Sequence, residues 1–289
     1  MIPKLAVVGL GLIGGSLARA ARTSRAAARI AGFDVDVRQR QLALELGVVD
    51  EAAASAAEAV AGADVVVLAV PVLHTAEALR ACRSGLADGA VVTDVGSTKQ
   101  SVLADVTRAC AGVLPPWFVA GHPIAGTEKS GVANAVPGLF HGRRVILTPH
   151  RDQDRAALAR VASLWQACGA RVVEMDPARH DSIFAATSHL PHLLAYAFVD
   201  MLSRLDGSGD LFANAGGGFR DFTRIASSSP EMWHDIVRAN ADSVGALLER
   251  QIGELGALLA LIRGGRWPEL QATFERARAA RERWLAQIE

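Results

Sequence analysis

Gly9-Leu10-Gly11-Leu12-Ile13-Gly14 is the most specific local signal in this 289-residue chain. The apolar run Leu5 to Val8 precedes it and predicts a short strand, and the Ala-rich segment Leu12 to Thr23 after it predicts a helix. In such a strand-turn-helix the first glycine permits a tight turn, the second lets the backbone approach a pyrophosphate, and the third lets the helix pack closely on the strand. The pattern therefore predicts a dinucleotide site at the N-terminus of this helix.

An acidic residue, Asp34, follows the next predicted strand at about the spacing, ~20 residues, that dinucleotide sites use. A carboxylate there hydrogen-bonds the adenosine ribose and repels a 2′-phosphate, which favours NAD over NADP. Arg38 and Arg40 leave NADP open, because they could pair with a phosphate if their loop turned inward. The residues expected to contact the cofactor are Gly9, Gly11, Leu12, Ile13, Gly14, Asp34, Val70 and Pro71.

Short β-branched runs alternate with helical stretches through the first half of the chain. The predicted strands are Leu5–Val8, Arg29–Phe33, Val65–Val70, Val91–Val95 and Phe118–Ala120, and the helices between them include Leu12–Thr23, Leu73–Cys82 and Lys99–Cys110. Continuous apolar strands alternating with helices predict a parallel sheet covered on both faces. We expect Arg144–Leu147 and Arg171–Glu174, separated by a helix over Asp152–Cys168, to extend this sheet. The fold class predicted for residues 1–175 is α/β, a Rossmann-type doubly wound domain.

From Asp176 onward the strand-like alternation almost disappears. The segment Trp233 to Ile262 carries a stripe of apolar residues three and four apart, which predicts a long amphipathic helix; its members are Ala241, Val244, Leu248, Ile252, Leu255, Leu259 and Ile262. We expect residues 176–289 to form an all-helical domain for substrate binding and dimerisation, with part of the stripe and Trp267 to Leu285 forming a homodimer seam. The alternative is a bundle formed within one chain.

Composition excludes several classes of protein. Thirty basic and thirty acidic side chains give a formal net charge of zero, which disfavours nucleic-acid binding and a polybasic membrane contact. No segment approaches the ~20 apolar residues of a membrane-spanning helix, and the N-terminus lacks the apolar region of a signal peptide. Three widely spaced cysteines argue against a disulfide framework and favour a cytoplasmic location. Only three basic residues are lysines, so a retained lysine has a specific reason.

Two loops are expected at the carboxyl ends of the fourth and fifth strands, where parallel sheets bind ligands. The first is Asp94 to Lys99 and the second Gly121 to Gly131, and two of the three lysines fall in them. His122 precedes a proline, which favours an extended conformation that projects the ring at a strand end. An imidazole there can accept a hydroxyl proton at neutral pH while hydride leaves the same carbon, and Ser97 could hold that hydroxyl. The alternative is a structural His122 and a helix-capping Ser97.

Two segments of the helical half carry further candidates. Ser188-His189-Leu190-Pro191-His192 places two histidines three residues apart, but no other ligands at a recognisable spacing complete a metal site, so we expect no metal. The segment Gly216 to Ala226 combines glycines with Arg220 and Arg224. An arginine in a concave site is suited to recognise a carboxylate, so we expect a small anionic substrate; a surface ion pair is the alternative for Arg224.

These motifs together resemble the prephenate and arogenate dehydrogenases of tyrosine biosynthesis over nearly the whole chain. The resemblance is carried by Gly9–Gly14, Asp94–Lys99 (DVGSTK), Gly121–Gly131 (GHPIAGTEKSG), Ser188–His192 (SHLPH) and Gly218–Trp233 (GFRDFTRIASSSPEMW). It implies an oxidoreductase with a Rossmann domain and a helical dimerisation domain that oxidatively decarboxylates a cyclohexadienol. Hydride passes from the ring carbon that bears the hydroxyl to the nicotinamide, and carbon dioxide leaves as the ring becomes aromatic.

The resemblance also implies roles for individual residues. His122 polarises or deprotonates the ring 4-hydroxyl with Ser97 hydrogen-bonded to it, and Arg224 pairs with a substrate carboxylate. Asp221 orients a pocket histidine, and Arg220 reaches across the dimer. The substrate pocket is lined by Ser188, His189, His192, Thr127, Glu128 and Trp233.

Prephenate with NAD is the leading interpretation, and arogenate or dual use is the alternative. The two substrates differ by a keto group against an ammonium, and Glu128 would favour the amine if it pointed at it. Two other classes of protein remain: a Rossmann dehydrogenase of a β-hydroxyacid or an imine, against which GHPIAGTEKSG argues, and a dinucleotide sensor without catalysis, for which a base such as His122 is unnecessary.

Overall fold

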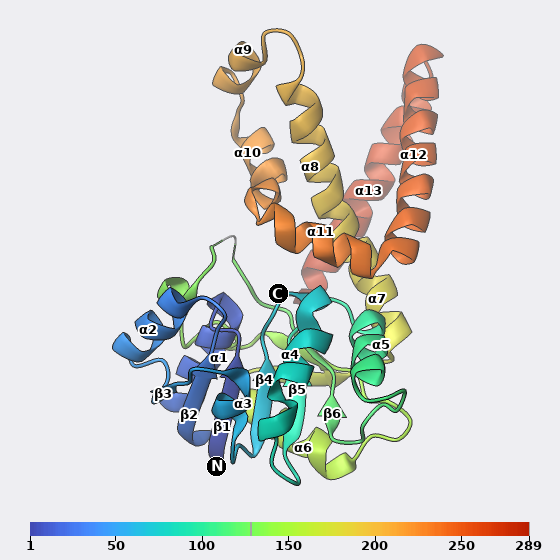
Figure 1. The fold of residues 1–289 in the computed structure, drawn as a ribbon. Coiled ribbons are helices and arrows are strands. Elements are labelled where there is room, and N and C mark those ends of the chain that lie inside the picture. The colour runs from blue at the N-terminus through green and yellow to red at the C-terminus, as the bar shows by residue number, and fades with distance from the viewer. Residues whose placement is uncertain (128, 289) are drawn as a thin grey trace. The chain divides into compact units, whose positions relative to one another are not determined.

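A six-stranded parallel sheet lies at the centre of the N-terminal part of the computed structural model, which describes residues 1–127 and 129–288 (Figure 1). Its strand order is β3-β2-β1-β4-β5-β6. The strands are β1 (Ile2–Val8), β2 (Ala27–Phe33), β3 (Glu51–Ala52), β4 (Val65–Leu68), β5 (Val91–Asp94) and β6 (Phe118–Val119). The order reverses between β1 and β4, and at such a switch point a crevice opens outside the carboxyl ends of the strands. The predicted Rossmann-type sheet is confirmed.

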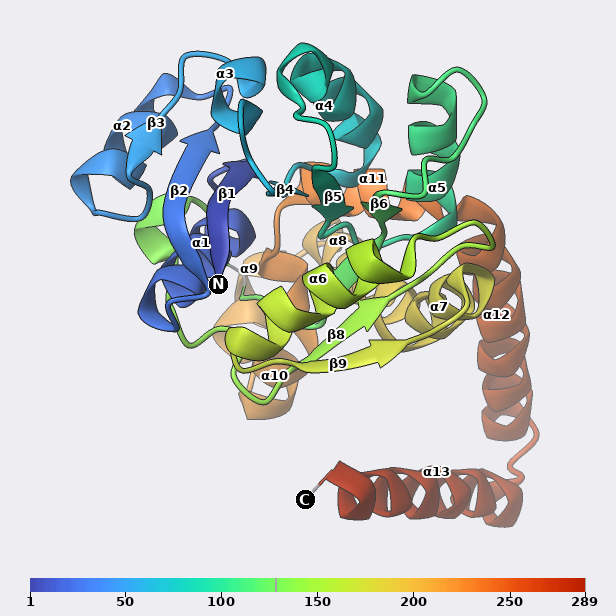
Figure 2. The ribbon, with the colours of Figure 1, turned by 90° about the horizontal axis from the view of Figure 1, so that it is seen from below.

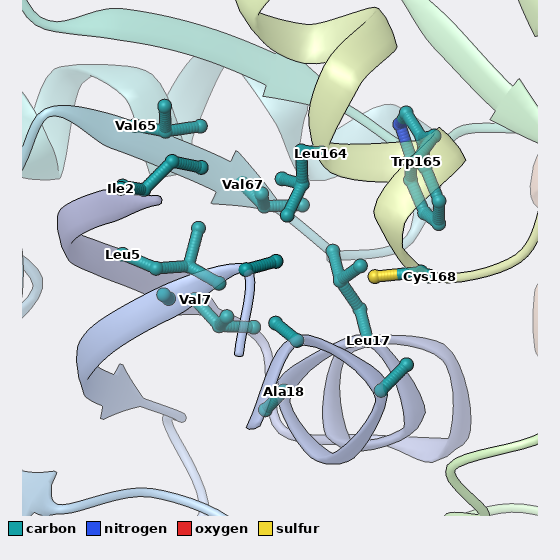
Figure 3. Close-up of a cluster of buried hydrophobic side chains, with 14 of the residues drawn as sticks. Ile2, Leu5, Val7, Leu17, Ala18, Val65, Val67, Leu164, Trp165 and Cys168 are labelled. Carbon is teal, nitrogen blue, oxygen red and sulfur yellow. The ribbon is translucent and has the colours of Figure 1, made fainter. Parts of the chain in front are cut away.

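Both faces of this sheet are covered, because side chains of alternating direction along each strand enter two separate cores. Leu5 and Val7 of β1 pack with Leu17, Leu164 and Trp165 on one face (Figure 3). The opposite core contains Ala6, Val8, Val66, Leu79 and Val102. The helices of this part are α1 (Leu12–Thr23), α2 (Val37–Glu45), α3 (Ala56–Val60), α4 (Thr75–Cys82), α5 (Gln100–Ala109) and α6 (Arg155–Ala167).

The expectation that Arg144–Leu147 and Arg171–Glu174 extend the main sheet is wrong. They form β8 and β9, which run parallel side by side (Figure 2). Together with β7 (Gly121–Pro123), which pairs antiparallel with β8, they make a separate three-stranded sheet. The pairing of β5 with β6 stops at Thr93 and Val119, and the Gly121 N–H donates to the Asp94 carboxylate, 3.0 Å away. Because a side chain takes this donor, the backbone ladder ends there and the chain leaves the sheet.

After Met175 the described residues form helices and no strands, as predicted. The elements are α7 (Pro177–Phe184), a π-helical turn (Ala185–His189), α8 (Leu190–Ser203), α9 (Ser208–Ala213), α10 (Gly217–Thr223), a 3₁₀ turn (Arg224–Ser227), α11 (Pro230–Ala239), α12 (Ala241–Arg263) and α13 (Trp267–Ile288). The long helix predicted from the apolar stripe is α12, but Trp233 lies in α11. The two helices are separate because the chain bends at Asn240, whose side-chain amide donates to the Asp181 carbonyl, 2.9 Å away.

The chain divides into two compact units, residues 1–241 and the part from Asp242 onward. The second unit exposes large apolar side chains on both of its helices in the isolated chain. On α12 these are Ile252, Leu255, Leu259 and Ile262, and on α13 they are Trp267, Phe274 and Trp284. Within the described ranges, none of the helices has the length and apolarity needed to cross a membrane.

Candidate active site

A cleft of about 530 Å³ opens beyond the carboxyl ends of β1, β2 and β4. Of the residues predicted to contact a cofactor, Gly9, Gly11, Asp34, Val70 and Pro71 line it. Leu12 and Ile13 do not line it: they open α1, and the side chain of Leu12 is buried while that of Ile13 packs against the core. Their backbone N–H groups belong to the first turn of α1, where helical N–H groups lack intrahelical partners and can bind phosphate.

Two of the three glycines of the motif meet a steric constraint within the protein. Gly9 has φ +99°, and a Cβ there would lie 2.2 Å from the carbonyl oxygen of Ala69. A Cβ on Gly14 would lie 2.0 Å from the carbonyl oxygen of Gly9, so this position holds the helix against the turn. A Cβ on Gly11 would meet nothing within 4 Å. The turn explains the glycine at position 9 and the helix packing explains the one at position 14. Gly11 leaves open the space that a pyrophosphate needs.

The residues around Asp34 bear on the choice between NAD and NADP. The Asp34 carboxylate accepts the N–H groups of Leu10 and Asp36, at 2.7 and 2.9 Å, which holds it at the cleft. Arg40 donates to the carbonyls of Ala53 and Ala54, at 3.2 and 2.9 Å. Because Arg40 is occupied by these carbonyls and a carboxylate stands where a 2′-phosphate would lie, the site favours the unphosphorylated ribose.

A buried ion pair supports the loop that carries His122. The Lys99 ammonium lies 2.5 Å from an Asp94 oxygen and donates to the carbonyl of Gly121, 2.6 Å away. Lys99 and Asp94 are 0% and 1% exposed. Asp94 also accepts the N–H groups of Gly96 and Gly121. The pair therefore holds both the N–H and the carbonyl of Gly121, the residue directly before His122.

His122 lies on β7 and belongs to a chain of hydrogen bonds that ends at a carboxylate. Its Nδ1 lies 2.9 Å from Nε2 of His180, and His180 Nδ1 lies 2.8 Å from an oxygen of Asp181. The same carboxylate accepts the N–H groups of Lys99 and Gln100, at 2.7 and 2.9 Å. His180 and Asp181 are fully buried on α7, so this arrangement ties α7 to the start of α5 and to β7.

The environment keeps His122 uncharged at neutral pH. Burial holds the pKa of His122 well below its usual range, and the nearby His180, Lys99 and His189 lower it further. Burial also lowers the pKa of His180, although its hydrogen bond to Asp181 opposes the shift. Burial raises the pKa of Asp181, but the N–H donors of His180, Gln100 and Lys99 outweigh it, so the net pKa of Asp181 is below its usual value. A neutral imidazole can act as a base.

A second group of side chains continues the site from His122 toward Arg224. The Trp233 ring stacks on His192, with centroids 3.6 Å apart, and meets His189 edge to face at 6.1 Å. The His192 Nδ1 pairs with the carbonyl of Ser188, 2.9 Å away. Burial lowers the pKa of His192 and the charge of Arg224 adds to this effect, which places Arg224 near this group.

Two polar atoms in this group have no hydrogen-bond partner among the described residues. They are Nε2 of His189 and Nε1 of Trp233, both buried. Burial lowers the pKa of His189 to about 4, so it is neutral at pH 7. A buried polar atom without a partner costs roughly 1–3 kcal/mol, which marks these atoms as positions for polar atoms of a ligand.

Three sequence-predicted residues that the structure describes do not join these contacts. Ser97 is partly buried and makes no hydrogen bond to His122 within the described part of the chain; the His122 Nδ1 pairs with His180 instead. Asp221 makes no hydrogen bond to a histidine among the described residues of the isolated chain: its side chain is 79% exposed and lies 3.7 Å from Nε of Arg220. Thr127 is exposed and accepts the Lys129 N–H. Glu128 lies outside the described residues.

Sequence reasoning missed His180, Asp181 and Asn240. No periodicity or motif separates them from other polar residues at helix starts and ends. Lys99 attracted attention because lysine is rare in this chain. The structure gives the reason for a lysine here: its ammonium contacts both the Asp94 carboxylate and the carbonyl of Gly121. No group of three or more His, Cys, Asp or Glu residues in the described ranges is arranged to hold a metal ion.

The fold and the dinucleotide cleft together define a dinucleotide-dependent oxidoreductase. The chain belongs to the prephenate dehydrogenase family, whose model for the nucleotide-binding domain matches residues 17–174 and whose model for the dimerization domain matches residues 176–276.

Individual relatives agree with this assignment. Prephenate dehydrogenase of Bacillus subtilis (strain 168) is 41% identical over 253 residues, 86% of this chain and 67% of the relative. Cyclohexadienyl dehydrogenase of Zymomonas mobilis is 34% identical over 96% of this chain and 94% of the relative. The crystal structure of prephenate dehydrogenase from Aquifex aeolicus with hydroxyphenyl propionate and NAD⁺ has a TM-score of 0.90 at 37% identity, covering 97% of this chain and 98% of that one. Synechocystis arogenate dehydrogenase has a TM-score of 0.79 at 29% identity, covering 97% and 99%.

Proposed function

We propose that the chain catalyses the NAD-dependent oxidative decarboxylation of prephenate to 4-hydroxyphenylpyruvate in tyrosine biosynthesis. The observation that carries the proposal is the neutral, partly buried imidazole of His122 in the same compact unit as the dinucleotide cleft. Glu231 of α11 lines that cleft, and Trp233, on the same helix, stacks on His192. One helix therefore borders both the cofactor cleft and the histidine group, which supports a cofactor and a substrate side by side.

The cleft fits NAD in shape and chemistry. Gly11 leaves space for the pyrophosphate, the first turn of α1 offers N–H groups, and Asp34 suits the ribose hydroxyls. Val70 and Pro71 form a further wall. When bound, NAD supplies the acceptor for the hydride that leaves the substrate ring.

The chain's own contribution to the chemistry centres on His122. Its Nε2 makes no hydrogen bond within the described part of the chain, whereas Nδ1 pairs with His180. A neutral imidazole in this state accepts the proton of the ring 4-hydroxyl at Nε2, so the electron pair of the O–H bond can form the ring carbonyl as hydride leaves. The ring carboxylate then leaves as carbon dioxide, and its bonding electrons complete the aromatic ring as the carbonyl oxygen becomes a phenolate. The imidazolium of His122 returns the proton to this oxygen. We assign Ser97 to the substrate hydroxyl, as the family resemblance implies.

Substrate binding is assigned to the group near Arg224. The guanidinium pairs with a substrate carboxylate, and the unpartnered atoms of His189 and Trp233 meet polar substrate atoms. Burial lowers the pKa values of His189 and His192, so at pH 7 they act as neutral hydrogen-bonding groups. The remaining pocket residues taken from the family resemblance are Ser188, Thr127, Glu128 and Asp221.

The test measures NADH formation by its near-ultraviolet absorbance with NAD and prephenate, with NAD and arogenate, and with NAD alone. Formation of NADH with prephenate and release of carbon dioxide support the proposal. Turnover of arogenate alone would reassign the substrate to the amine, and absence of turnover with both would refute the proposal. Repeating the assay with NADP tests the cofactor, because more efficient turnover with NADP would overturn the role given to Asp34.

We also propose that the chain divides functionally into residues 1–175 and 176–289 and acts as a homodimer in the cytoplasm. Exposed apolar side chains along α12 and α13 need cover, and a second copy of the same helices is self-complementary. Three free cysteines suit a reducing compartment. Light scattering on the chain and on a Leu255→Glu variant tests the dimer: a wild-type monomer at micromolar concentration would refute it.

A further inference from the structure

We infer that His180 and Asp181 are positioning residues that hold His122 in the tautomer with hydrogen on Nδ1 and a lone pair on Nε2. This inference rests on the proposed function for its catalytic meaning. The hydrogen-bond geometry that carries it stands in the structure independently of any substrate.

The direction of the hydrogen bonds is set at the Asp181 end. Its carboxylate accepts two backbone N–H groups, from Lys99 and Gln100, and each of these can only donate. The same contacts lower the pKa of Asp181, so it is ionised at neutral pH and has no hydrogen to offer. At 2.8 Å from this carboxylate, Nδ1 of His180 must therefore be the donor.

The protonation of His180 in turn decides which nitrogen of His122 carries hydrogen. A neutral imidazole with hydrogen on Nδ1 has a lone pair on Nε2. Burial lowers the pKa of His180, which favours this neutral form over a doubly protonated one. His180 Nε2 is thus an acceptor, and the His122 Nδ1, 2.9 Å away, must donate to it. The lone pair of His122 is consequently on Nε2, the nitrogen left for the substrate.

The same arrangement acts during proton transfer. When Nε2 of His122 takes the hydroxyl proton, the ring becomes an imidazolium whose Nδ1–H still donates to His180, so no reorientation is needed. The hydrogen bond from His180 Nδ1 to the Asp181 carboxylate holds the His180 ring so that its Nε2 acceptor faces this N–H. The N–H that the imidazolium presents to His180 therefore already has its acceptor in place.

His189 provides an internal reference, because its contacts set the opposite tautomer. Asn240 Nδ2 donates to the Asp181 main-chain carbonyl, so its amide N–H₂ group also faces Nδ1 of His189, 3.3 Å away. His189 Nδ1 is then an acceptor, and its hydrogen is on Nε2. Two neutral histidines of one site thus carry their hydrogens on different nitrogens.

The direct test is ¹⁵N NMR of the full chain labelled at histidine, with His122 and His189 assigned by loss of their signals in His122→Asn and His189→Asn. We expect His122 to show a protonated Nδ1 and an unprotonated Nε2, and His189 the reverse. A protonated Nε2 on His122 would overturn the inference. This readout needs no substrate, so it can fail or succeed separately from the proposed function.

Two substitutions at His180 test the consequence for turnover. Glutamine keeps an acceptor for His122 Nδ1–H, because the Asp181 carboxylate attracts the amide N–H₂ and turns the carbonyl oxygen toward His122. Phenylalanine fills space without an acceptor. We expect His180→Phe to lower kcat about 10- to 100-fold, a part of the ~10²- to 10⁴-fold that general base catalysis contributes, with KM changed by less than about 3-fold. His180→Gln should recover at least half of this loss on a logarithmic scale.

The matched control is His234→Phe. His234 also precedes an aspartate, Asp235, and lies 3.0 Å from it, but its side chain is 67% exposed. This variant should keep the wild-type kcat. If His180→Phe folds with the thermal stability of His180→Gln and turns over equally fast, the positioning role is refuted. If His180→Phe does not fold, the tautomers of wild type and His180→Gln still decide the matter.

Discussion

Replacing Lys99 by methionine should lower the free energy of unfolding by about 3–5 kcal/mol, the usual result of removing one partner from a buried ion pair. The ammonium is completely buried and lies 2.5 Å from Asp94 and 2.6 Å from the carbonyl of Gly121. Methionine has a similar length and no charge, so the main change is electrostatic. It leaves a buried carboxylate with only two N–H donors, from Gly96 and Gly121, and leaves the Gly121 carbonyl without its donor.

Urea unfolding followed by tryptophan fluorescence measures this loss. A domain of this kind has roughly 5–15 kcal/mol of stability, so the change is a large fraction of the total. The double variant Lys99→Met with Asp94→Asn should recover part of the loss, because it removes the stranded charge. Arg204→Met is the surface control, since Arg204 pairs with Asp200 at 2.8 Å while both side chains are about two-thirds exposed; it should change stability by less than ~1 kcal/mol. Equal effects of Lys99→Met and Arg204→Met would refute the argument.

Three further outcomes are expected. His122→Asn should lower kcat by roughly 10²- to 10⁴-fold while NAD affinity, measured by calorimetry, stays the same; unaltered turnover would remove His122 from the mechanism. Arg224→Ala should raise KM about 10- to 100-fold, as expected for a lost charge-assisted bond to the substrate, and an unchanged KM in steady-state assays would place the anchor elsewhere. Acidification should destabilise the fold, because the folded-state pKa of His189, about 4, is below its unfolded value. The contribution of His189 to the free energy of unfolding is complete above pH ~6.5 and is lost as the pH falls toward 4, by on the order of 3 kcal/mol. A urea midpoint that stays the same when the pH is lowered from ~6.5 to ~4 would contradict this prediction.

The turn at Gly9 to Gly14 illustrates what a local pattern can predict. The need for positive φ at Gly9 and for close packing at Gly14 is met by glycine alone, so the residue type itself records the geometry. The strands of the main sheet are similarly visible, because each is buried on both faces and must be apolar throughout. Where β7 leaves the sheet no such record exists: the switch depends on Asp94 accepting the N–H of Gly121, a contact between residues far apart in sequence.

The histidine group shows the same division. His122, His189 and His192 were found because they stand in motifs, and Arg224 because arginine recognises carboxylates. His180 and Asp181 look like ordinary polar residues of a helix, and they matter because α7 packs against β7 and the start of α5. Residue type and spacing along the chain thus predict the parts that are governed by local sterics and by burial, namely the cofactor turn, the sheet and the helical half. The tautomer of a histidine depends on hydrogen-bond partners that folding brings together from distant segments. The order of residues along the chain does not show these partners.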